Sequence, residues 1–289
     1  MINSKVLMSD ALHFSNEQPI NPYYHLESID LAKAEAEHAH IRELLQQAGV
    51  SVVNVSSPAT SQDGVYTANW ALVRGNKAVL ARLPDARKSE QPHAKLALEA
   101  LGIDVFELPP HLRFSGQGDA LPCGDLLFCG SNYRSDAEAQ AIAADILGYR
   151  RIQLQTKPQL DARGLPVTNT SSDWPDSFYY DIDLALSIIK APENGQKGLI
   201  AYCPEAFTEE SQQILAELSD VDKIMVSEHE AKNAFACNLV STGSTVVMSA
   251  HAPELSAELT ARGFTLLHPE IKELVKGGGY IRCTTLTLE

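Results

Sequence analysis

The sequence of 289 residues lacks long apolar runs. No uninterrupted run reaches the roughly 18 apolar residues that indicate a membrane-spanning helix. The N-terminus also lacks a basic region followed by an apolar stretch and a small-residue cleavage site, which together mark a secretory signal. We therefore expect a cytoplasmic protein that is neither exported nor inserted into a membrane.

Positive charge is scarce. Lysine and arginine number 23 against 37 aspartates and glutamates, which gives a net charge of −14. This balance repels phosphate backbones and anionic lipid surfaces, and no basic cluster offsets it locally. The sequence therefore predicts no nucleic-acid or membrane partner. It favours a cationic ligand, although an acidic surface can also serve solubility alone.

Cysteine pairs and metal-binding clusters are missing as well. The five cysteines are an odd number, widely spaced in a chain too long to need disulfide stapling: Cys123, Cys129, Cys203, Cys237 and Cys283. No C-x-x-C pair occurs, and no histidine–cysteine cluster has the spacing of zinc ligands. We expect free thiols in a reducing compartment, no metal and no cofactor.

The remaining sequence has 44% apolar and 21% charged residues, enough apolar material for a sizeable core. Helical patterns alternate with short β-rich runs, and no low-complexity linker divides the chain. Helices are predicted at 27–48, 136–147, 208–218, 228–235 and 253–262, and strands at 50–55, 65–73, 78–83, 125–130 and 239–248. The segment 74–77 predicts a hairpin turn. These patterns indicate one mixed α/β domain over residues 1–289 and leave open whether it forms a homo-oligomer.

The segment 276–288, KGGGYIRCTTLTL, carries the first candidate for chemistry. Three consecutive glycines allow the backbone to approach another group closely. The thiol of Cys283 follows at the start of an alternating Thr/Leu pattern, which predicts a strand. Cys283 is therefore a candidate nucleophile, and an inert buried cysteine is the alternative.

The segment 178–186, FYYDIDLAL, places two acids in an apolar run. If this segment is a strand, Asp181 and Asp183 project from the same face, about 7 Å apart along the chain. Buried carboxylates are costly unless a cation or donors satisfy them, and the forked N–H groups of a guanidinium fit carboxylate geometry. The alternative is an exposed edge strand or helix start with solvated acids.

A third candidate lies in the segment 114–121, FSGQGDAL. Its glycines predict a tight loop that presents Asp119, although turn chemistry alone explains the same pattern. Arg134 stands just before a predicted helix, where it could receive the carboxylate of a ligand.

Taken in order with 19–23 (PINPY), 67–73 (TANWALV) and 228–247, these segments resemble the amidinotransferase/dimethylarginine dimethylaminohydrolase superfamily. The similarity runs from about residue 20 to 288. The pairing of T-A-N-x-x-L-V with G-G-x-I-R-C-x-T-L is much more specific than either motif alone. The I-N-P and T-A-N motifs are most similar to the arginine-dihydrolase-like branch.

The resemblance implies a pentein fold, in which five ββαβ modules form an α/β propeller around a central pocket. It also implies a cysteine that attacks the guanidino carbon, forming a thiouronium intermediate that water or an acceptor amine resolves. By position, Cys283 would be the nucleophile and Asp183 the acid that binds the guanidinium nitrogens. The other implied pocket residues are Asn21 in an N-terminal substrate loop, Asn69, Arg134 on the α-carboxylate, and Asp119 as a buttress or substrate contact.

The chain departs from this family at two positions. Family members have His-x-Asp where this chain has Asp181, Ile182 and Asp183, and no histidine occurs between His111 and His229. That histidine would protonate the departing nitrogen and then activate water. Ser115 likewise stands where the family motif usually carries an acid.

We expect a hydrolase acting on a carbon–nitrogen bond of arginine or a substituted guanidine, with Asp181 in place of the histidine. A neighbouring carboxylate can raise an aspartate pKa until the pair shares a proton, which would make Asp181 a usable acid. Two alternatives stay open. The chain could be a catalytically degenerate pentein that binds a guanidino ligand as a sensor or interaction module, or it could be an amidinotransferase.

Overall fold

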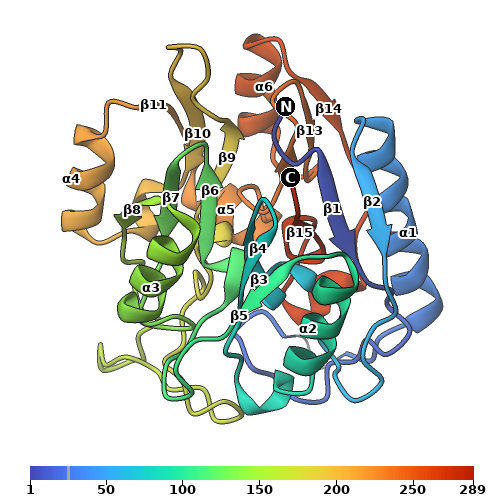
Figure 1. Ribbon diagram of the computed structural model, residues 1–289. Coiled ribbons are helices and arrows are strands. Elements are labelled where there is room, and N and C mark those ends of the chain that lie inside the picture. Colours follow the sequence, from blue (N-terminus) through green and yellow to red (C-terminus); the bar gives the residue numbers. More distant parts are fainter. Residues whose placement is uncertain (25–26) are drawn as a thin grey trace.

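Five three-stranded sheets surround the centre of the molecule in the computed structural model, which describes residues 1–24 and 27–289 (Figure 1). In each sheet the middle strand pairs antiparallel with one neighbour and parallel with the other. A helix connects each parallel pair, as a crossover between parallel strands requires. The mixed α/β class and the five ββαβ modules of a pentein are thus confirmed.

Four modules are continuous in sequence. The first two are β3 (Ala71–Arg74), β4 (Lys77–Leu80), α2 (Glu90–Ala100) and β5 (Asp104–Phe106), then β6 (Ala120–Cys123), β7 (Leu126–Cys129), α3 (Ala137–Leu147) and β8 (Arg150–Gln153). The next two are β9 (Leu186–Lys190), β10 (Gly198–Tyr202), α4 (Glu209–Glu217) and β11 (Val221–Met225), then β12 (Val240–Ser241), β13 (Thr245–Val247), α6 (Pro253–Ala261) and β14 (Thr265–Leu267). Helix α5 (Glu228–Ala234) precedes β12.

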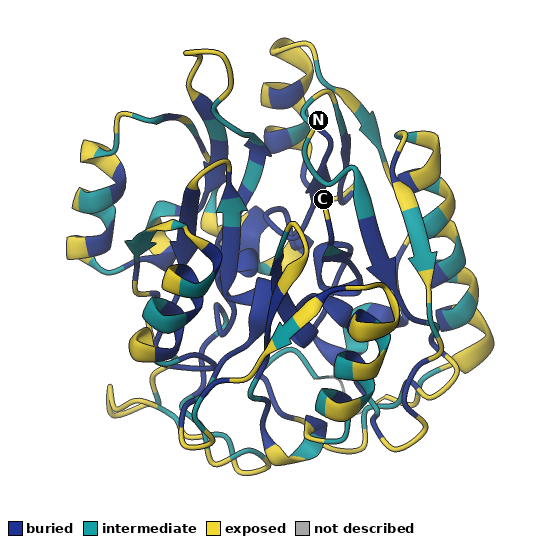
Figure 2. Cartoon of the chain, in the orientation of Figure 1, coloured by how far each residue is buried: buried dark blue, intermediate teal, exposed yellow. Residues whose placement is uncertain are grey.

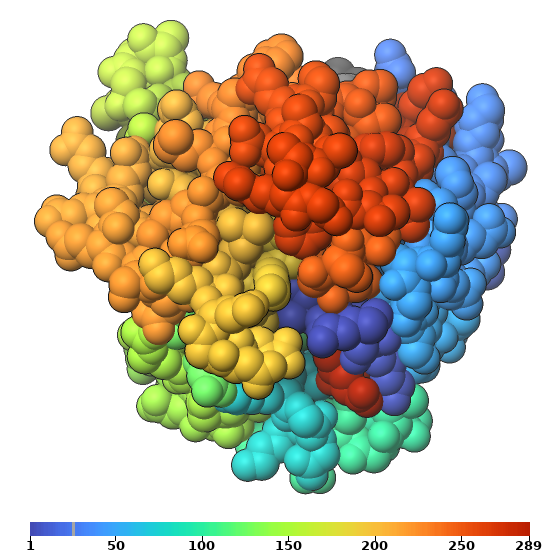
Figure 3. Space-filling view, turned by 90° about the horizontal axis from the view of Figure 1, so that it is seen from above, coloured from blue at the N-terminus to red at the C-terminus, as the bar shows by residue number. Residues whose placement is uncertain are grey.

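The fifth module joins the two ends of the chain. Strand β15 (Leu286–Thr287) pairs antiparallel with β1 (Lys5–Met8), which runs parallel to β2 (Ser51–Asn54) after α1 (Leu31–Gln47). Seen from above, the first and last residues lie side by side between neighbouring modules (Figure 3). The ring is therefore closed by strand pairing, and this closure fixes the segment that leads into β15.

The core follows from the pattern of each element. Helix α1 buries Ala34, His38, Ile41 and Leu45, a spacing that forms one stripe on a helix. Its first turn is capped by Asp30, whose side chain accepts a hydrogen bond from the Lys33 amide. Figure 2 shows the inner strands buried and the outward faces of the helices exposed. The ring thus directs its apolar surface inward, around the segments that carry the site.

Most predicted elements agree with the structure. All five predicted helices occur, as α1, α3, α4, α5 and α6, and the turn at 74–77 connects β3 to β4 in an antiparallel hairpin. The predicted strands at 50–55 and 125–130 correspond to β2 and β7, and 239–248 contains β12 and β13. Helix α2 was not predicted. Its Pro92 lies in the first turn, where a missing N–H costs no helical hydrogen bond.

The strands expected around the candidate site residues are only partly present. The segment 178–186 is not a strand, because Asp181 is followed by a 3-10 turn at Ile182–Leu184 and β9 begins only at Leu186. Cys283 lies in another 3-10 turn, Arg282–Thr284, and β15 begins three residues after it. The first part of 65–73 also forms a turn, Thr67–Trp70. In these turns backbone amides donate hydrogen bonds to carbonyls a few residues earlier, for example Leu184 to Asp181 and Thr285 to Arg282. They are therefore not paired with a neighbouring strand.

All five cysteines are free and buried. Within residues 1–24 and 27–289, no helix combines the length and apolar character needed to cross a membrane.

Ring closure should depend on the packing of β15. Leu286 is fully buried in a cluster with Leu7 and Trp70, so Leu286→Ala should lower the free energy of unfolding by about 2–5 kcal/mol, measured in urea. Met225→Ala, at a side chain that is 74% exposed, serves as the control and should change stability by less than about 0.5 kcal/mol. Equal urea midpoints for the two variants would contradict this account.

Candidate active site

A small enclosed cavity lies at the centre of the ring. It is lined by residues from many parts of the chain: Ile20, Asn21, Asp63, Tyr66, Asn69, Leu83, Arg87, Ser115, Arg134, Tyr180, Asp181, Gly277, Gly279 and Cys283. The structure therefore brings Asn21, Asn69, Arg134, Asp181 and Cys283 together around one cavity. Asp183 contacts the sulfur of Cys283, and Asp119 contacts the backbone between the two other acids.

The Cys283 thiol has two polar partners. It donates a hydrogen bond to Asp183 Oδ2 at 3.5 Å, and Sγ accepts one from Asn238 Nδ2 at 3.2 Å. Asn238 Oδ1 also accepts from the backbone N–H of Cys283, so one amide fixes both the backbone and the sulfur. Burial and the charge of Asp183 raise the pKa of the Cys283 thiol, which is therefore protonated in the free protein.

Three buried carboxyl groups lie at and next to this site. Asp119, Asp181 and Asp183 are each at most 2% exposed, and each has one oxygen without a hydrogen-bond partner among the described residues. Burial raises the pKa of all three, and the charge of Asp181 raises the pKa values of the other two further. Unsatisfied buried acids destabilise a protein, and a cation with several N–H donors would relieve that cost.

Asp119 supports the segment that carries the other two acids. Its Oδ1 accepts a hydrogen bond from the Ile182 amide at 3.0 Å, between Asp181 and Asp183. A Cβ atom at Gly130 would lie only 2.3 Å from that oxygen, so glycine is required opposite the carboxylate. Asp119 thus contacts the acid-bearing segment, and its role as a buttress or a substrate contact stays a prediction.

Asn69 orients Asp181. Its Nδ2 donates to Asp181 Oδ2 at 2.7 Å and to Ser115 Oγ at 2.9 Å. Its Oδ1 accepts from Arg87 at 2.8 Å, which fixes the direction of the amide. A Cβ atom at Gly118 would lie 2.3 Å from Asn69 Nδ2 and 2.6 Å from Asp181 Oδ2. The G-Q-G-D segment therefore gives room for this contact as well as forming a turn.

Arg87 was not among the predicted site residues. Its buried guanidinium donates to Glu90 at 2.8 and 2.7 Å and to two backbone carbonyls. Glu90 is fully buried and also accepts from Trp70 Nε1 at 3.0 Å and from Ser61 Oγ at 2.6 Å. The signal in the sequence was the Arg-x-x-Glu spacing, which suits an ion pair over one helical turn. Asn238, the second residue missed, has no comparable motif.

The glycine segment packs against the N-terminal loop. Gly278 has φ +84°, and a Cβ atom there would lie 2.3 Å from Asn21 Oδ1. Asn21 Nδ2 donates to the Gly277 carbonyl at 3.1 Å, and its Oδ1 accepts from the Tyr23 amide at 3.0 Å. The amide of Asn21 thus ties the two segments together, and its role toward a substrate stays a prediction.

Arg134 is a buried cation beside aromatic rings. Its guanidinium donates to the Ile20 carbonyl and lies 4.9 Å from the centre of the Tyr180 ring and 5.8 Å from that of Trp174. Among the residues described, none forms an ion pair with Arg134. Its positive charge opposes the effect of burial on Asp181 and lowers the pKa of that carboxyl group. Arg134 therefore has capacity to bind an anionic group of a ligand.

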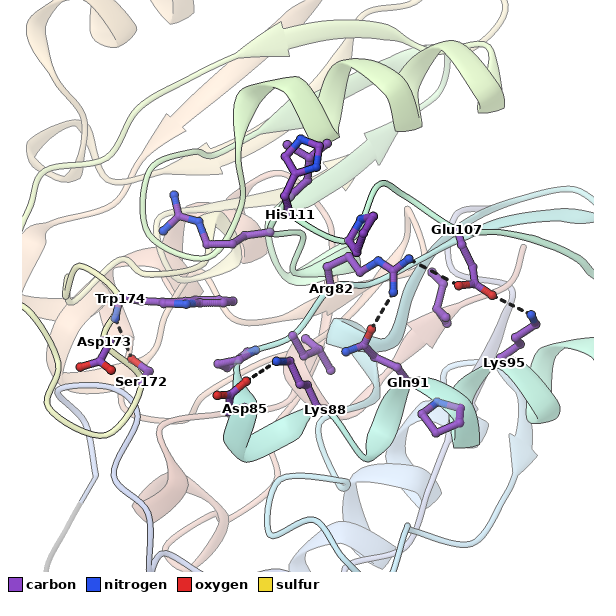
Figure 4. A pocket seen from close by; sticks show the side chains of 17 residues that line it. Arg82, Asp85, Lys88, Gln91, Lys95, Glu107, His111, Ser172, Asp173 and Trp174 are labelled. Carbon is purple, nitrogen blue, oxygen red and sulfur yellow. Dashed lines mark hydrogen bonds and ion pairs between the residues drawn. The ribbon is translucent and has the colours of Figure 1, made fainter.

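A larger cavity of about 860 Å³ adjoins the enclosed one, because Leu83 lines both. Figure 4 shows Trp174 on one side of this outer cavity and Glu107 with Lys95 on the opposite side. Trp174 lies near two arginines, since the guanidinium of Arg113 is 5.5 Å and that of Arg134 is 5.8 Å from its ring centre. The outer cavity is therefore next to the segment that covers Arg134.

Comparisons with known proteins show which family the chain is similar to. The model of the family described as N,N-dimethylarginine dimethylhydrolase, eukaryotic, matches residues 14–170. The dimethylarginine dimethylaminohydrolase of Mycobacterium tuberculosis is 30% identical over 97% of this chain and 84% of its own length. The bifunctional arginine dihydrolase/ornithine cyclodeaminase AgrE of Nostoc is also 30% identical, over 98% of this chain but only 37% of its own length.

Solved structures have the same fold. The N-terminal domain of the cyanobacterial arginine dihydrolase ArgZ, bound to substrate, superposes with a TM-score of 0.84 at 26% identity, covering 98% of this chain and 97% of that one. The Pseudomonas aeruginosa dimethylaminohydrolase, in complex with citrulline, gives a TM-score of 0.73 at 17% identity and 99% coverage of both chains. The second likeness concerns the fold alone.

The fold and the cavity define a guanidino-group-modifying enzyme of the pentein superfamily, in its arginine-dihydrolase-like branch. The chain belongs to the N,N-dimethylarginine dimethylhydrolase family. It is a hydrolase of carbon–nitrogen bonds in linear amidines, of the kind that acts on arginine-type substrates.

The buried ion pair behind Asn69 should be essential for stability. Glu90→Ala would leave the Arg87 guanidinium buried without its carboxylate, at a cost of about 3–5 kcal/mol in the free energy of unfolding. Glu99→Ala, at an exposed position of the same helix, is the matched control and should stay close to the parent in urea unfolding. A loss below about 1 kcal/mol for Glu90→Ala would show that the pair is not needed.

Proposed function

We propose that the chain hydrolyses a carbon–nitrogen bond in the guanidino group of arginine or a substituted arginine through a thiouronium adduct on Cys283. One observation carries this proposal: a thiol lies 3.5 Å from Asp183 among three buried carboxyl groups that each keep one oxygen unpaired. A planar cation with several N–H donors would bind the unpaired oxygen of Asp181, which lines the cavity, and place its carbon beside the sulfur.

The proposed substrate would also supply the charge that the thiol lacks. Burial and Asp183 disfavour the thiolate of Cys283 in the free protein. A guanidinium bound beside the sulfur favours the thiolate, because an opposite charge within about 4–6 Å stabilises an ionised group. The thiolate then attacks the guanidino carbon, an amine or ammonia departs, and water releases the product.

The rest of the substrate would extend toward Arg134. This guanidinium has no ion-pair partner among the described residues and is held between aromatic rings, so it suits the α-carboxylate of an amino acid. Asn69 would keep Asp181 in position, and Asp119 would support the acid-bearing segment. Asn21 would hold the N-terminal loop over the glycine segment.

A second function is favoured by one feature, the aspartate at position 181. If the missing histidine is indispensable, the chain binds a guanidino compound without turnover and acts as a sensor or interaction module. An amidinotransferase would turn over only when an acceptor amine is present. The three functions therefore differ in product formation, not in the binding of the guanidino group.

Product formation separates these functions. The purified protein, incubated with arginine, methylated arginines or agmatine, should release ammonia or an amine together with a ureido or diamine product. Cys283→Ser should lower kcat by about 10³-fold or more, since a hydroxyl is a far weaker nucleophile without an activating base. Cys123→Ser, a buried cysteine of β6, is the control and should keep activity. Activity that survives in Cys283→Ser would refute the covalent mechanism.

Calorimetry with arginine identifies the sensor. Binding without turnover, with or without an acceptor amine, would support the non-catalytic function and count against hydrolysis. In that case Asp181→His should restore product formation if the rest of the cavity is intact. Asp222→His, at an exposed position of β11, controls for nonspecific effects of an added imidazole.

A further inference from the structure

We propose that Asp183 is the group that transfers protons in this reaction and that Asp181 is the fixed carboxylate that anchors the guanidinium. This assignment rests on the proposed hydrolysis and specifies how the site works without a histidine. It differs from the expectation that the aspartate at the histidine position does the work of the histidine.

The hydrogen bonds of the sulfur indicate where its proton goes. Asn238 can only donate to Sγ through its NH₂ group, whereas Asp183 Oδ2 accepts the thiol proton. The thiol is thus held between one donor and one acceptor. When the proton moves to Asp183, the donor from Asn238 remains to stabilise the thiolate. The second oxygen of Asp183 has no partner among the described residues and is free to take part in the later steps.

Asp181 is placed for a different task. Its Oδ2 accepts the 2.7 Å hydrogen bond from Asn69, whose direction Arg87 fixes from the other side. Burial raises the pKa of Asp181, and the positive charges of Arg134 and Arg87 oppose that rise. Its Oδ1 is unpaired, and the residue lines the enclosed cavity together with Cys283. A carboxylate held in this way suits a permanent counter-charge better than a group that must exchange protons.

The surroundings of Asp183 favour proton exchange. Burial and the charge of Asp181 raise its pKa, while Arg282, Cys283 and Asn238 lower it. The charge of Asp183 in turn raises the pKa values of the neighbouring groups Asp119, Tyr180 and Cys237. Arg282 is occupied with Thr285, Thr287 and Gln117, so it forms no ion pair with Asp183. A carboxyl group with a raised pKa can hold and release a proton near neutral pH.

The proposed reaction conserves atoms and charge at each step. The thiol proton of Cys283 passes to Asp183, and the thiolate forms a bond to the guanidino carbon, giving a neutral tetrahedral adduct. Asp183 then returns that proton to the departing nitrogen, the C–N bond breaks, and a thiouronium cation remains. Asp183 next takes a proton from water as the oxygen bonds to the same carbon. The C–S bond breaks, one proton re-forms the thiol, and the other leaves the site with ammonia as ammonium.

The test compares two isosteric variants, Asp183→Asn and Asp181→Asn. With Asp183→Asn, kcat should fall about 10²- to 10⁴-fold, while the dissociation constant for arginine, measured by calorimetry, stays within about threefold. With Asp181→Asn, arginine binding should weaken by at least about tenfold, because the anchoring charge is lost. Asp222→Asn, on the surface of β11, is the matched control and should change neither quantity.

A second measurement excludes a merely structural role. The charge of Asp183 disfavours the thiolate, so in Asp183→Asn the alkylation of Cys283 by iodoacetamide, followed by mass spectrometry, should shift to lower pH. A thiol that ionises more readily in a slower enzyme shows that the sulfur is still in place, so the loss of turnover comes from the missing carboxyl group. Parallel losses of alkylation and turnover would instead indicate a misplaced sulfur and overturn the assignment.

Other outcomes also decide the question. Loss of turnover with intact binding in Asp181→Asn, combined with weak binding in Asp183→Asn, would reverse the two roles and leave the proposed hydrolysis standing. If the parent protein turns over no guanidino compound, the proposed function fails. Should Asp183→Asn not fold, Asp183→Glu retains a carboxyl group and should keep more activity than Asp183→Ser. Equal activity of those two variants would refute proton transfer by Asp183.

Discussion

Negative charge buried at the centre of a closed ring is the constraint on which the rest of this structure depends. Asp119, Asp181 and Asp183 lie close together with little exposure, and each keeps an oxygen unpaired among the described residues. Such an arrangement costs stability in the free protein and is tolerated because the surrounding fold holds it. The proposed guanidinium substrate would offset part of that cost on binding.

The strand pairing that closes the ring also positions Cys283. Cys283 comes three residues before β15, the strand through which the end of the chain pairs with β1. The sulfur is therefore positioned by contacts between the two termini, while the acids arrive from the middle of the chain. Glycines at 118, 130 and 278 allow the close approaches, since a Cβ atom at any of them would collide with a polar side chain of the site.

Because position 181 is an aspartate and not a histidine, substrate binding and proton transfer must both be carried out by carboxyl groups. In a buried site, a carboxyl group exchanges protons near neutral pH only if its ionised form is disfavoured. Burial raises the pKa of Asp181, but a hydrogen bond from Asn69 and the charges of Arg134 and Arg87 oppose that rise, whereas the charge of Asp181 itself raises the pKa of Asp183 further. The same low-dielectric pocket thus produces two carboxyl groups of different character, one suited to binding and one to proton transfer.

The sequence by itself determined the α/β class, most helices and the hairpin before β4, because periodicity and turn chemistry are local properties. Its motifs also singled out Cys283, Asp181, Asp183, Asn69 and Arg134, which the structure brings close together. It did not reveal that the acids and the thiol lie on 3-10 turns instead of strands, or that Arg87 and Asn238 hold the site. Tertiary structure decided these points, because a backbone amide that finds a buried side-chain or turn partner has no need of a neighbouring strand, and such partners come from distant parts of the chain.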